Sequence, residues 1–98
     1  MKLRIAAAAR RDLERGYRFY EAQGEGLGSY FLDALFSDID SLRLYADVHP
    51  QVWSGYHRLL ARRFPYAIYY RLDDEVVFIY AVLDCRRNPE THEKRLRR

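Results

Sequence analysis

The spacing of apolar and polar residues predicts a strand followed by a helix at the start of the chain. Residues 2–5 alternate between polar and apolar side chains, which is the pattern of a short strand with one buried face. Four alanines follow at residues 6–9, and the last of them begins a series, Ala9, Leu13, Tyr17 and Tyr20, that recurs at intervals of three or four residues. Residues at these intervals share one side of a helix, so this segment is predicted to be an amphipathic helix.

A second amphipathic helix is predicted from about Ser29 to Tyr45. Gly24, Gly26 and Gly28 precede it and mark a flexible turn. Its apolar stripe consists of Leu27, Phe31, Leu35, Ile39 and Leu42. Two amphipathic helices joined by a short glycine-rich turn form an antiparallel hairpin, so a helical hairpin is expected here.

The second half of the chain is predicted to form three consecutive strands. They span about residues 56–63, 66–72 and 75–84. Pro65 separates the first two strands, and residues 76–83 are apolar throughout, which fits a central strand covered on both faces. Residues 47–50 are expected to be a loop. Residues 86–98 are expected to be a basic tail in which Pro89 prevents an early helix.

These elements together predict an α+β fold in a single domain covering residues 1–98. The helical hairpin is expected to pack on one face of a small, mainly antiparallel sheet, and the first strand is expected beside the last. The shared core is predicted to contain Leu13, Phe31, Leu35, Tyr66, Ile68, Val77, Ile79 and Val82. A chain of 98 residues that is 49% apolar can build such a core without metal or disulfide.

Positive charge is concentrated in the second half of the chain. The net charge is +3, and residues 56–98 carry ten Lys or Arg against six Asp or Glu. Arginine outnumbers lysine fifteen to two, and the planar guanidinium matches carboxylate and phosphate groups well. A basic half of this kind indicates a polyanionic target or an acidic protein partner. A solvated charged surface has the same composition, so charge alone leaves both interpretations open.

The remaining composition favours a cytoplasmic protein without cofactors. Cys85 is the only cysteine, so no disulfide can form within the chain. No apolar run approaches the ~20 residues of a membrane span, and the first eleven residues lack the core of a signal peptide. The histidines, at positions 49, 57 and 92, are scattered, and no metal site, cofactor or membrane contact is expected.

A set of arginines forms the main candidate for functional chemistry. The predicted target-binding residues are Arg58, Arg62, Arg71, Arg86, Arg87 and Arg95. If the strand continues to residue 63, Arg58 and Arg62 share one face of it and Arg63 lies on the other. Together with nearby tyrosines, these residues suit either a nucleic-acid backbone with stacked bases or an acidic protein.

Several short motifs follow one another at characteristic positions. Residues 9–13 read Ala-Arg-Arg-Asp-Leu, Tyr20 lies near the end of the first helix, and residues 26–28 read Gly-Leu-Gly. Residues 63–70 read Arg-Phe-Pro-Tyr-Ala-Ile-Tyr-Tyr, and residues 82–89 end in Arg-Arg-Asn-Pro. The order and spacing of these motifs resemble the RelE/ParE toxin superfamily, in particular its plasmid-stabilisation branch, over roughly residues 3 to 90.

The resemblance implies the toxin component of a type II toxin–antitoxin system. Such a toxin arrests growth until a cognate antitoxin protein neutralises it. RelE-like members cut messenger RNA inside the ribosome, whereas ParE-like members poison DNA gyrase, so the shared fold does not select the target. A third possibility is an inactive relative that binds only its antitoxin.

The distribution of basic residues favours the gyrase-type activity. RelE-like enzymes spread both lysines and arginines over the sheet. This chain has only two lysines, Lys2 and Lys94, and both lie near its ends, so the lysine part of that pattern is depleted. The candidate catalytic residues for RNA cleavage are Arg62, Arg63, Arg86 and His92, and no acid–base pair stands out among them. Arg86, which directly follows the apolar strand, is the residue expected to matter most for activity, and Arg87 is expected to matter less.

Overall fold

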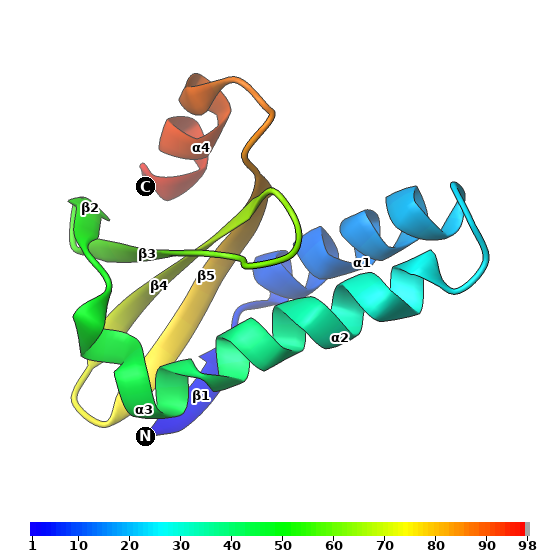
Figure 1. Cartoon of the computed structure of the whole chain (residues 1–98). Coiled ribbons are helices and arrows are strands. Elements are labelled where there is room, and N and C mark those ends of the chain that lie inside the picture. Colours follow the sequence, from blue (N-terminus) through cyan, green and yellow to red (C-terminus); the bar gives the residue numbers. More distant parts are fainter. Residues whose placement is uncertain (98) are drawn as a thin grey trace.

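The computed structural model describes residues 1–97 and has a helical hairpin on one face of a sheet and a short C-terminal helix on the other (Figure 1). The helices are α1 (Ala7–Glu21), α2 (Leu27–Asp40), α3 (Leu42–Tyr45) and α4 (Pro89–Leu96), with a short 3-10 helix η1 (Ala46–Val48). The strands are β1 (Lys2–Ile5), β2 (Gln51–Trp53), β3 (Tyr56–Leu60), β4 (Tyr66–Asp73) and β5 (Val76–Asp84). The predicted α+β fold is confirmed.

The five strands form one mainly antiparallel sheet. Their order across the sheet is β1-β5-β4-β3-β2, so the first strand lies beside the last, as the sequence predicts. β1 runs parallel to β5, with Leu3 opposite Val77, and every other neighbouring pair is antiparallel. The hairpin of α1 and α2 connects β1 to the remaining strands, which allows the parallel pairing because such a connection needs a long crossover.

The face of the sheet that carries α1 and α2, here called the hairpin face, contains the main core. All eight predicted core residues belong to this cluster, and Phe31, Leu35, Ile68, Val77 and Ile79 are fully buried. The cluster extends through Leu42 and Ala46 at the end of the hairpin. The core prediction is therefore confirmed in every member.

The two helices of the hairpin approach closely at two glycines. A Cβ on Gly16 would lie 2.5 Å from the ring of Phe31, and one on Gly28 would lie 2.7 Å from the ring of Tyr17. Glu21 closes the hairpin, because its carboxylate accepts hydrogen bonds from the backbone N–H groups of Gly26 and Gly28, at 3.1 and 2.8 Å. These bonds satisfy free N–H groups at the start of α2.

β5 contains a bulge within its apolar run, and residues from both of its faces belong to hydrophobic clusters. Tyr69 pairs with Ala81 and Tyr70 pairs with Ile79, so Tyr80 is an extra residue in β5. The extra residue reverses the alternation: Ile79 and Val82 both face the hairpin, although they are three positions apart. The predicted burial of this strand on both faces is confirmed.

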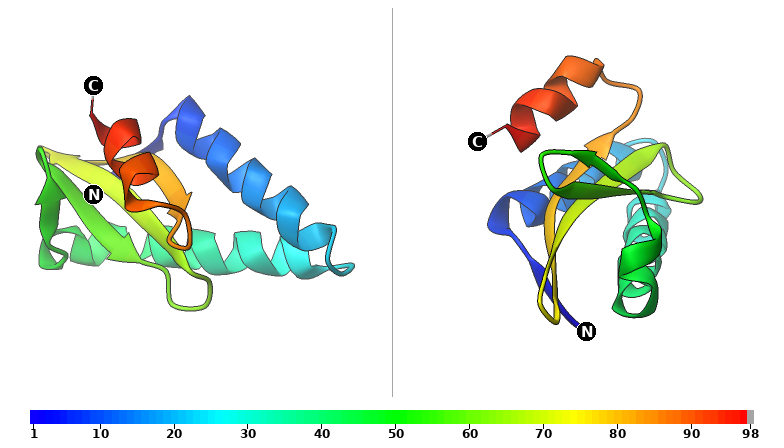
Figure 2. Two further views of the ribbon diagram at one scale, coloured as in Figure 1. Left: turned by 90° about the horizontal axis from the view of Figure 1, so that it is seen from above. Right: turned by 90° about the vertical axis from the view of Figure 1, so that its left-hand side faces the viewer.

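The opposite face of the sheet, here called the distal face, carries a smaller core under α4. This core contains Tyr56, Ala67, Tyr69, Ala81, Leu83 and Leu96. Leu96 is the residue through which α4 packs on the strands, and it is 4% exposed. Figure 2 shows α4 and the hairpin on opposite sides of the sheet.

The prediction that Pro89 prevents a helix is wrong, because Pro89 begins one. Proline is favoured in the first helical turn, where its missing N–H has no intrahelical partner to lose. The side chain of Asn88 caps this helix and accepts a hydrogen bond of 2.9 Å from the backbone N–H of Glu90. Residues 89–96 are therefore helical rather than an irregular tail.

The segment between the hairpin and β3 also differs from its prediction. The second helix begins at Leu27 and ends at Asp40, and Ser41 separates it from the short helix α3. The hydroxyl of Ser41 donates to the carbonyl of Asp38 at 2.6 Å, a side-chain bond that competes with regular helical bonding. Residues 51–53 form the unpredicted edge strand β2, which pairs irregularly with β3.

Candidate functional site

Arg62 belongs to the hairpin side of the molecule and not to the face of Arg58. β3 ends at Leu60, so the strand alternation does not reach Arg62, and the prediction that the two arginines share a face is wrong. The Nε of Arg62 donates to Oδ1 of Asp38 at 2.9 Å, and its backbone N–H donates to Oδ2 at 3.1 Å. Asp38 is 4% exposed, so this pair ties the β3–β4 connection to α2.

Arg86 is likewise committed to a partner within the chain. Its guanidinium donates twice to the carboxylate of Asp84, at 2.9 and 2.8 Å, and once to the hydroxyl of Tyr20 at 3.3 Å. The guanidinium also lies 5.7 Å from the ring centre of Phe19. The bonds from Arg86 lower the pKa of Asp84, and those same bonds raise the pKa of Arg86. Arg86 therefore links the end of β5 to α1.

Arg95 joins three elements through a buried carboxylate. Two of its nitrogens donate to Asp12 at 2.9 and 2.8 Å, and the side chain of Asp12 is 4% exposed. Asp12 also accepts the backbone N–H of Val82 at 3.0 Å. β5 pairs with β1 only as far as Ile79, so β1 offers no acceptor to the N–H of Val82. The carboxylate of Asp12 accepts this backbone N–H in its place.

The other four candidate arginines form no ion pair within residues 1–97. Arg63 lies on the hairpin side, 6.0 Å from the ring centre of Tyr30. The other three, Arg58, Arg71 and Arg87, lie on the distal face. Arg71 is 5.0 Å from the ring centre of Tyr56, which belongs to the distal core. The sequence-predicted arginines thus separate into a paired, structural group and an unpaired group gathered mainly on one face.

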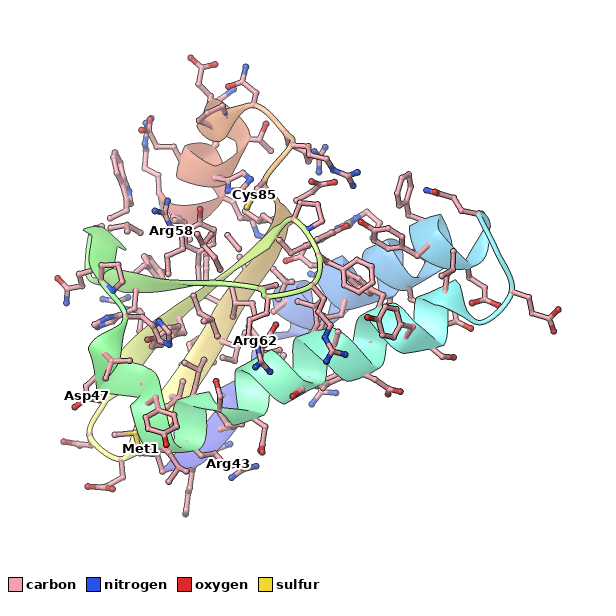
Figure 3. All side chains as sticks on the ribbon, in the orientation of Figure 1. Met1, Arg43, Asp47, Arg58, Arg62 and Cys85 are labelled. Carbon is pink, nitrogen blue, oxygen red and sulfur yellow. The ribbon has the colours of Figure 1, made fainter. Side chains whose placement is uncertain are left out.

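A cleft lies between α4 and the β2–β3 hairpin on the distal face. Its volume is about 270 Å³. The polar and aromatic residues that line it include Trp53, Arg58, Tyr69, Cys85, Arg87 and His92. Figure 3 shows Arg58 and Cys85 below α4, whereas Arg62 lies beside α2. Two of the three unpaired arginines of this face therefore share a cleft.

His92 has both of its ring nitrogens engaged inside the cleft. Nε2 lies 2.8 Å from the carbonyl oxygen of Asp84, and Nδ1 lies 2.8 Å from the hydroxyl of Tyr69. A carbonyl only accepts, so Nε2 donates to Asp84, and Nδ1 is hydrogen-bonded to the hydroxyl of Tyr69. Burial raises the pKa of Tyr69, which keeps this hydroxyl protonated. Both ring nitrogens therefore have partners within the chain.

The thiol in the cleft is also unsuited to nucleophilic chemistry. Burial and the nearby carboxylate of Asp84 raise the pKa of Cys85, although the charge of Arg58 partly opposes them. A thiol needs to be deprotonated to attack, so this thiol stays inert at neutral pH.

The four predicted catalytic residues lie at two separate places. Arg62 and Arg63 line one pocket beside α2, where Arg62 binds Asp38. Arg86 binds the carboxylate of Asp84, and Nε2 of His92 bonds the carbonyl oxygen of the same residue. Within residues 1–97 no group of three or more His, Cys, Asp or Glu residues is arranged to hold a metal ion. None of the helices in the described chain is long and apolar enough to cross a membrane.

Sequence reasoning missed the aromatic part of the cleft. Trp53 was not among the residues predicted for the site, and it lies at the mouth of the cleft because β2 places it there. No periodic signal marks a three-residue edge strand. Tyr69 stands within the motif at residues 63–70, yet its partner His92 lies 23 positions away.

Comparison with known proteins identifies the family. The family described as "ParE toxin of type II toxin-antitoxin system, parDE" matches residues 3–89. Two solved structures are similar: the chromosomal ParDE system of P. aeruginosa and the RelBE2 toxin–antitoxin complex of Mycobacterium tuberculosis.

The ParDE structure superposes with a TM-score of 0.71 at 19% identity, covering 84% of this chain and 92% of that chain. The RelBE2 structure gives a TM-score of 0.51 at 27% identity, covering 83% and 93%. No curated protein matches the sequence significantly. The family match spans most of the chain, so this chain belongs to the ParE toxin family of type II toxin–antitoxin systems.

Proposed function

We propose that this ParE-family toxin arrests growth by binding and poisoning DNA gyrase rather than by cutting messenger RNA. The observation that carries the proposal is that three of the four candidate catalytic groups are bound within the chain. Arg62 and Arg86 are paired with aspartates, and both nitrogens of His92 are hydrogen-bonded, whereas Arg63 forms no ion pair within residues 1–97. A poison that works by binding needs no free acid or base.

The alternative activity, ribosome-dependent cleavage of messenger RNA, makes stronger chemical demands. A metal-free ribonuclease activates the 2′-hydroxyl, stabilises the charged phosphorane and protonates the leaving oxygen. The hydroxyl of Tyr69 and the thiol of Cys85 both have raised pKa values, and neither is a ready base. The unpaired arginines can stabilise negative charge, but a guanidinium has no acceptor atom and does not serve as a general base.

The distal face supports a binding role. Arg58, Arg71 and Arg87 are unpaired there, next to Tyr56 and Trp53. Unpaired guanidiniums beside aromatic rings are typical of surfaces that bind phosphates or carboxylates of a macromolecule. In the proposed activity these residues contact the target, and the proposed location is the cytoplasm, where gyrase acts.

A cognate antitoxin is the second proposed partner. A disordered antitoxin segment that folds on contact can dock as a strand on a sheet edge or as a helix in a groove. β1 is an edge strand, and a groove between α1 and α2 is lined by Leu13, Tyr17, Leu32 and Phe36. High-level expression of the chain without an antitoxin is expected to stop growth. Normal growth would contradict an active toxin and favour an inactive antitoxin-binding relative.

Two assays of the purified chain test the choice of target. The first measures inhibition of DNA supercoiling by gyrase, and the second measures cleavage of messenger RNA in a translating ribosome. We expect inhibition in the first assay and intact message in the second. Cleavage of the message without any effect on gyrase would overturn the proposal and establish the RelE-like alternative.

A further inference from the structure

The half of the distal face nearest the β4–β5 turn carries a row of alternating cations and aromatic rings. The sheet register places Arg4 on β1 and Arg71 on β4 opposite Phe78 of β5, one on each side of it. The guanidinium of Arg71 also lies 5.0 Å from the ring centre of Tyr56 on β3. The row therefore crosses four strands in the order Arg4, Phe78, Arg71 and Tyr56.

These four residues line one depression of about 810 Å³. Tyr80, the extra residue of the β5 bulge, also lines it, and its ring centre lies 5.0 Å from that of Tyr56. The depression extends to the β4–β5 turn, whereas α4 follows the other end of β5 (Figure 1). Within residues 1–97 it shares no lining residue with the cleft beside α4, so the two are separate parts of the distal face.

The depression contains unpaired charges of both signs. Arg4 and Arg71 form no ion pair within residues 1–97. Asp73 and Asp74, which line the depression at the β4–β5 turn, are likewise unpaired there. A nucleic acid carries only negative charge and meets these two carboxylates beside the row. A protein segment with acidic residues over the row and a basic residue near the turn complements both parts.

We propose that the target, DNA gyrase, places an acidic amphipathic helix across this half of the distal face. Two acidic side chains of the helix pair with Arg4 and Arg71, and an apolar side chain between them covers Phe78. The inference rests on the proposed function and deepens it, because it names the element of the target and adds Arg4 and Phe78 to the contact. Arg71 keeps the target as its only ligand.

The spacing of the two cations selects a helix over an extended segment. Arg4 and Arg71 lie on strands separated by β5, and neighbouring strands are about 4.8 Å apart, so their backbones are about 10 Å apart. Helix residues i and i+7 share one face and are separated by about 10.5 Å, with i+3 and i+4 between them on the same face. An extended segment spans about 10 Å in three residues, and its residues i and i+3 point to opposite faces.

Gyrase binding by purified variants of the full chain tests the row. Arg4→Glu is expected to weaken the binding of purified gyrase roughly five- to 30-fold in surface plasmon resonance, because it places a like charge against an acidic side chain. Arg4→Met removes the charge without reversing it and is expected to weaken binding less. Arg11→Glu is the matched control, because Arg11 is an exposed arginine of α1, and its binding should equal that of the unmodified chain. Circular dichroism checks that each variant is folded.

A photocrosslink at the centre of the row identifies what covers it. Phe78→p-benzoylphenylalanine is irradiated in the presence of gyrase and duplex DNA, and the crosslinked fragment is identified by mass spectrometry. We expect a helical segment of gyrase that carries acidic residues seven positions apart. A crosslink to DNA, or to a gyrase segment without that pattern, would overturn the proposal.

The binding results separate this inference from the proposed function. Absence of gyrase binding by the unmodified chain would remove the proposed target and the helix with it. Strong binding by the unmodified chain, equal to that of both Arg4→Glu and Arg11→Glu, would leave gyrase as the target but show that it does not contact this half of the distal face.

Discussion

The two faces of the sheet differ in how their polar groups are used. On the hairpin face, Asp38 and Asp12 are buried and each is bound by an arginine from a distant element. On the distal face, a smaller core lies under one short helix, and Arg58, Arg71 and Arg87 have no acidic partner within residues 1–97. The comparison indicates that the hairpin face stabilises the fold, whereas the distal face is available for binding.

The largest effect is expected from a cavity in the hairpin core. Leu35 on α2 is fully buried, so Leu35→Ala should lower the free energy of unfolding by about 2–5 kcal/mol. Urea denaturation measures this loss. Leu44→Ala is the matched control, because Leu44 is 77% exposed and its loss should stay within about 0.5 kcal/mol. A loss below about 1 kcal/mol for Leu35→Ala would contradict the burial of this face.

A smaller effect is expected where α4 is attached to the rest of the fold. Removing the acceptor with Asp12→Ala leaves Arg95 and the N–H of Val82 without their partner. Hydrogen bonds to charged groups contribute about 1.5–3 kcal/mol, and the side chain of Arg95 is 25% exposed and can partly return to water. We expect a loss within that range by urea denaturation.

Hydrogen exchange then locates the effect of Asp12→Ala. Faster exchange should be confined to α4 and the end of β5, while Leu35 and the rest of the hairpin core stay protected. Faster exchange spread evenly over the molecule would show that Asp12 supports the hairpin face and not the attachment of α4.

The pattern of the sequence predicted the hairpin face well because periodicity reports burial against a continuous surface. Phe31 and Leu35 repeat at helical spacing, and both reached the core. Apolar residues fill β5 on both faces, which concealed the extra residue Tyr80, because a bulge leaves no mark in an unbroken apolar run.

The distal face was less predictable because its contacts are long-range and its elements are short. Tyr69 is bonded to His92 across 23 positions, a sequence separation at which no pairing signal is visible. Pro89 was interpreted as a helix breaker, although proline also starts helices, and Asn88 before it was the capping signal that decides between the two.

A pH dependence of modest size is expected from the pair of Asp84 and Arg86. The pKa of Asp84 is lowered from its usual 3.8 by the bonds from Arg86. The pair therefore stabilises the fold above pH 3.8, and this contribution is lost as the pH falls through the lower pKa of the folded state. Arg86 is largely exposed, so the contribution should be about 0–1 kcal/mol.

Urea denaturation at pH 7 and pH 3 measures this contribution, with Arg86→Met as the comparison. The difference in stability between the two pH values should shrink in the variant. An unchanged pH dependence would show that the pair of Asp84 and Arg86 does not couple protonation to folding.

The smallest change in stability is expected at two neighbouring arginines, one paired with an aspartate and the other unpaired. The same two residues are expected to give the clearest difference in toxicity. Arg86 is bound to Asp84, whereas Arg87 is unpaired and lines the distal cleft. From this geometry we predict that Arg87 matters more for activity than Arg86, the opposite of the ranking expected from the sequence. Arg87→Ala should leave the free energy of unfolding within about 0.5 kcal/mol, since it removes an exposed side chain without a partner.

Growth after induction of each variant, without an antitoxin, separates the two arginines. Arg87→Ala should relieve growth arrest because it removes a cation that contacts the target, and Arg58→Ala should act in the same direction. Arg86→Ala should remain toxic, because its guanidinium already serves Asp84 and Tyr20 within the chain. Immunoblots confirm equal amounts of each variant, so that loss of protein is not mistaken for loss of activity. Relief by Arg86→Ala with full toxicity of Arg87→Ala would place the target contact at the junction of β5 and α1 and not on the distal face.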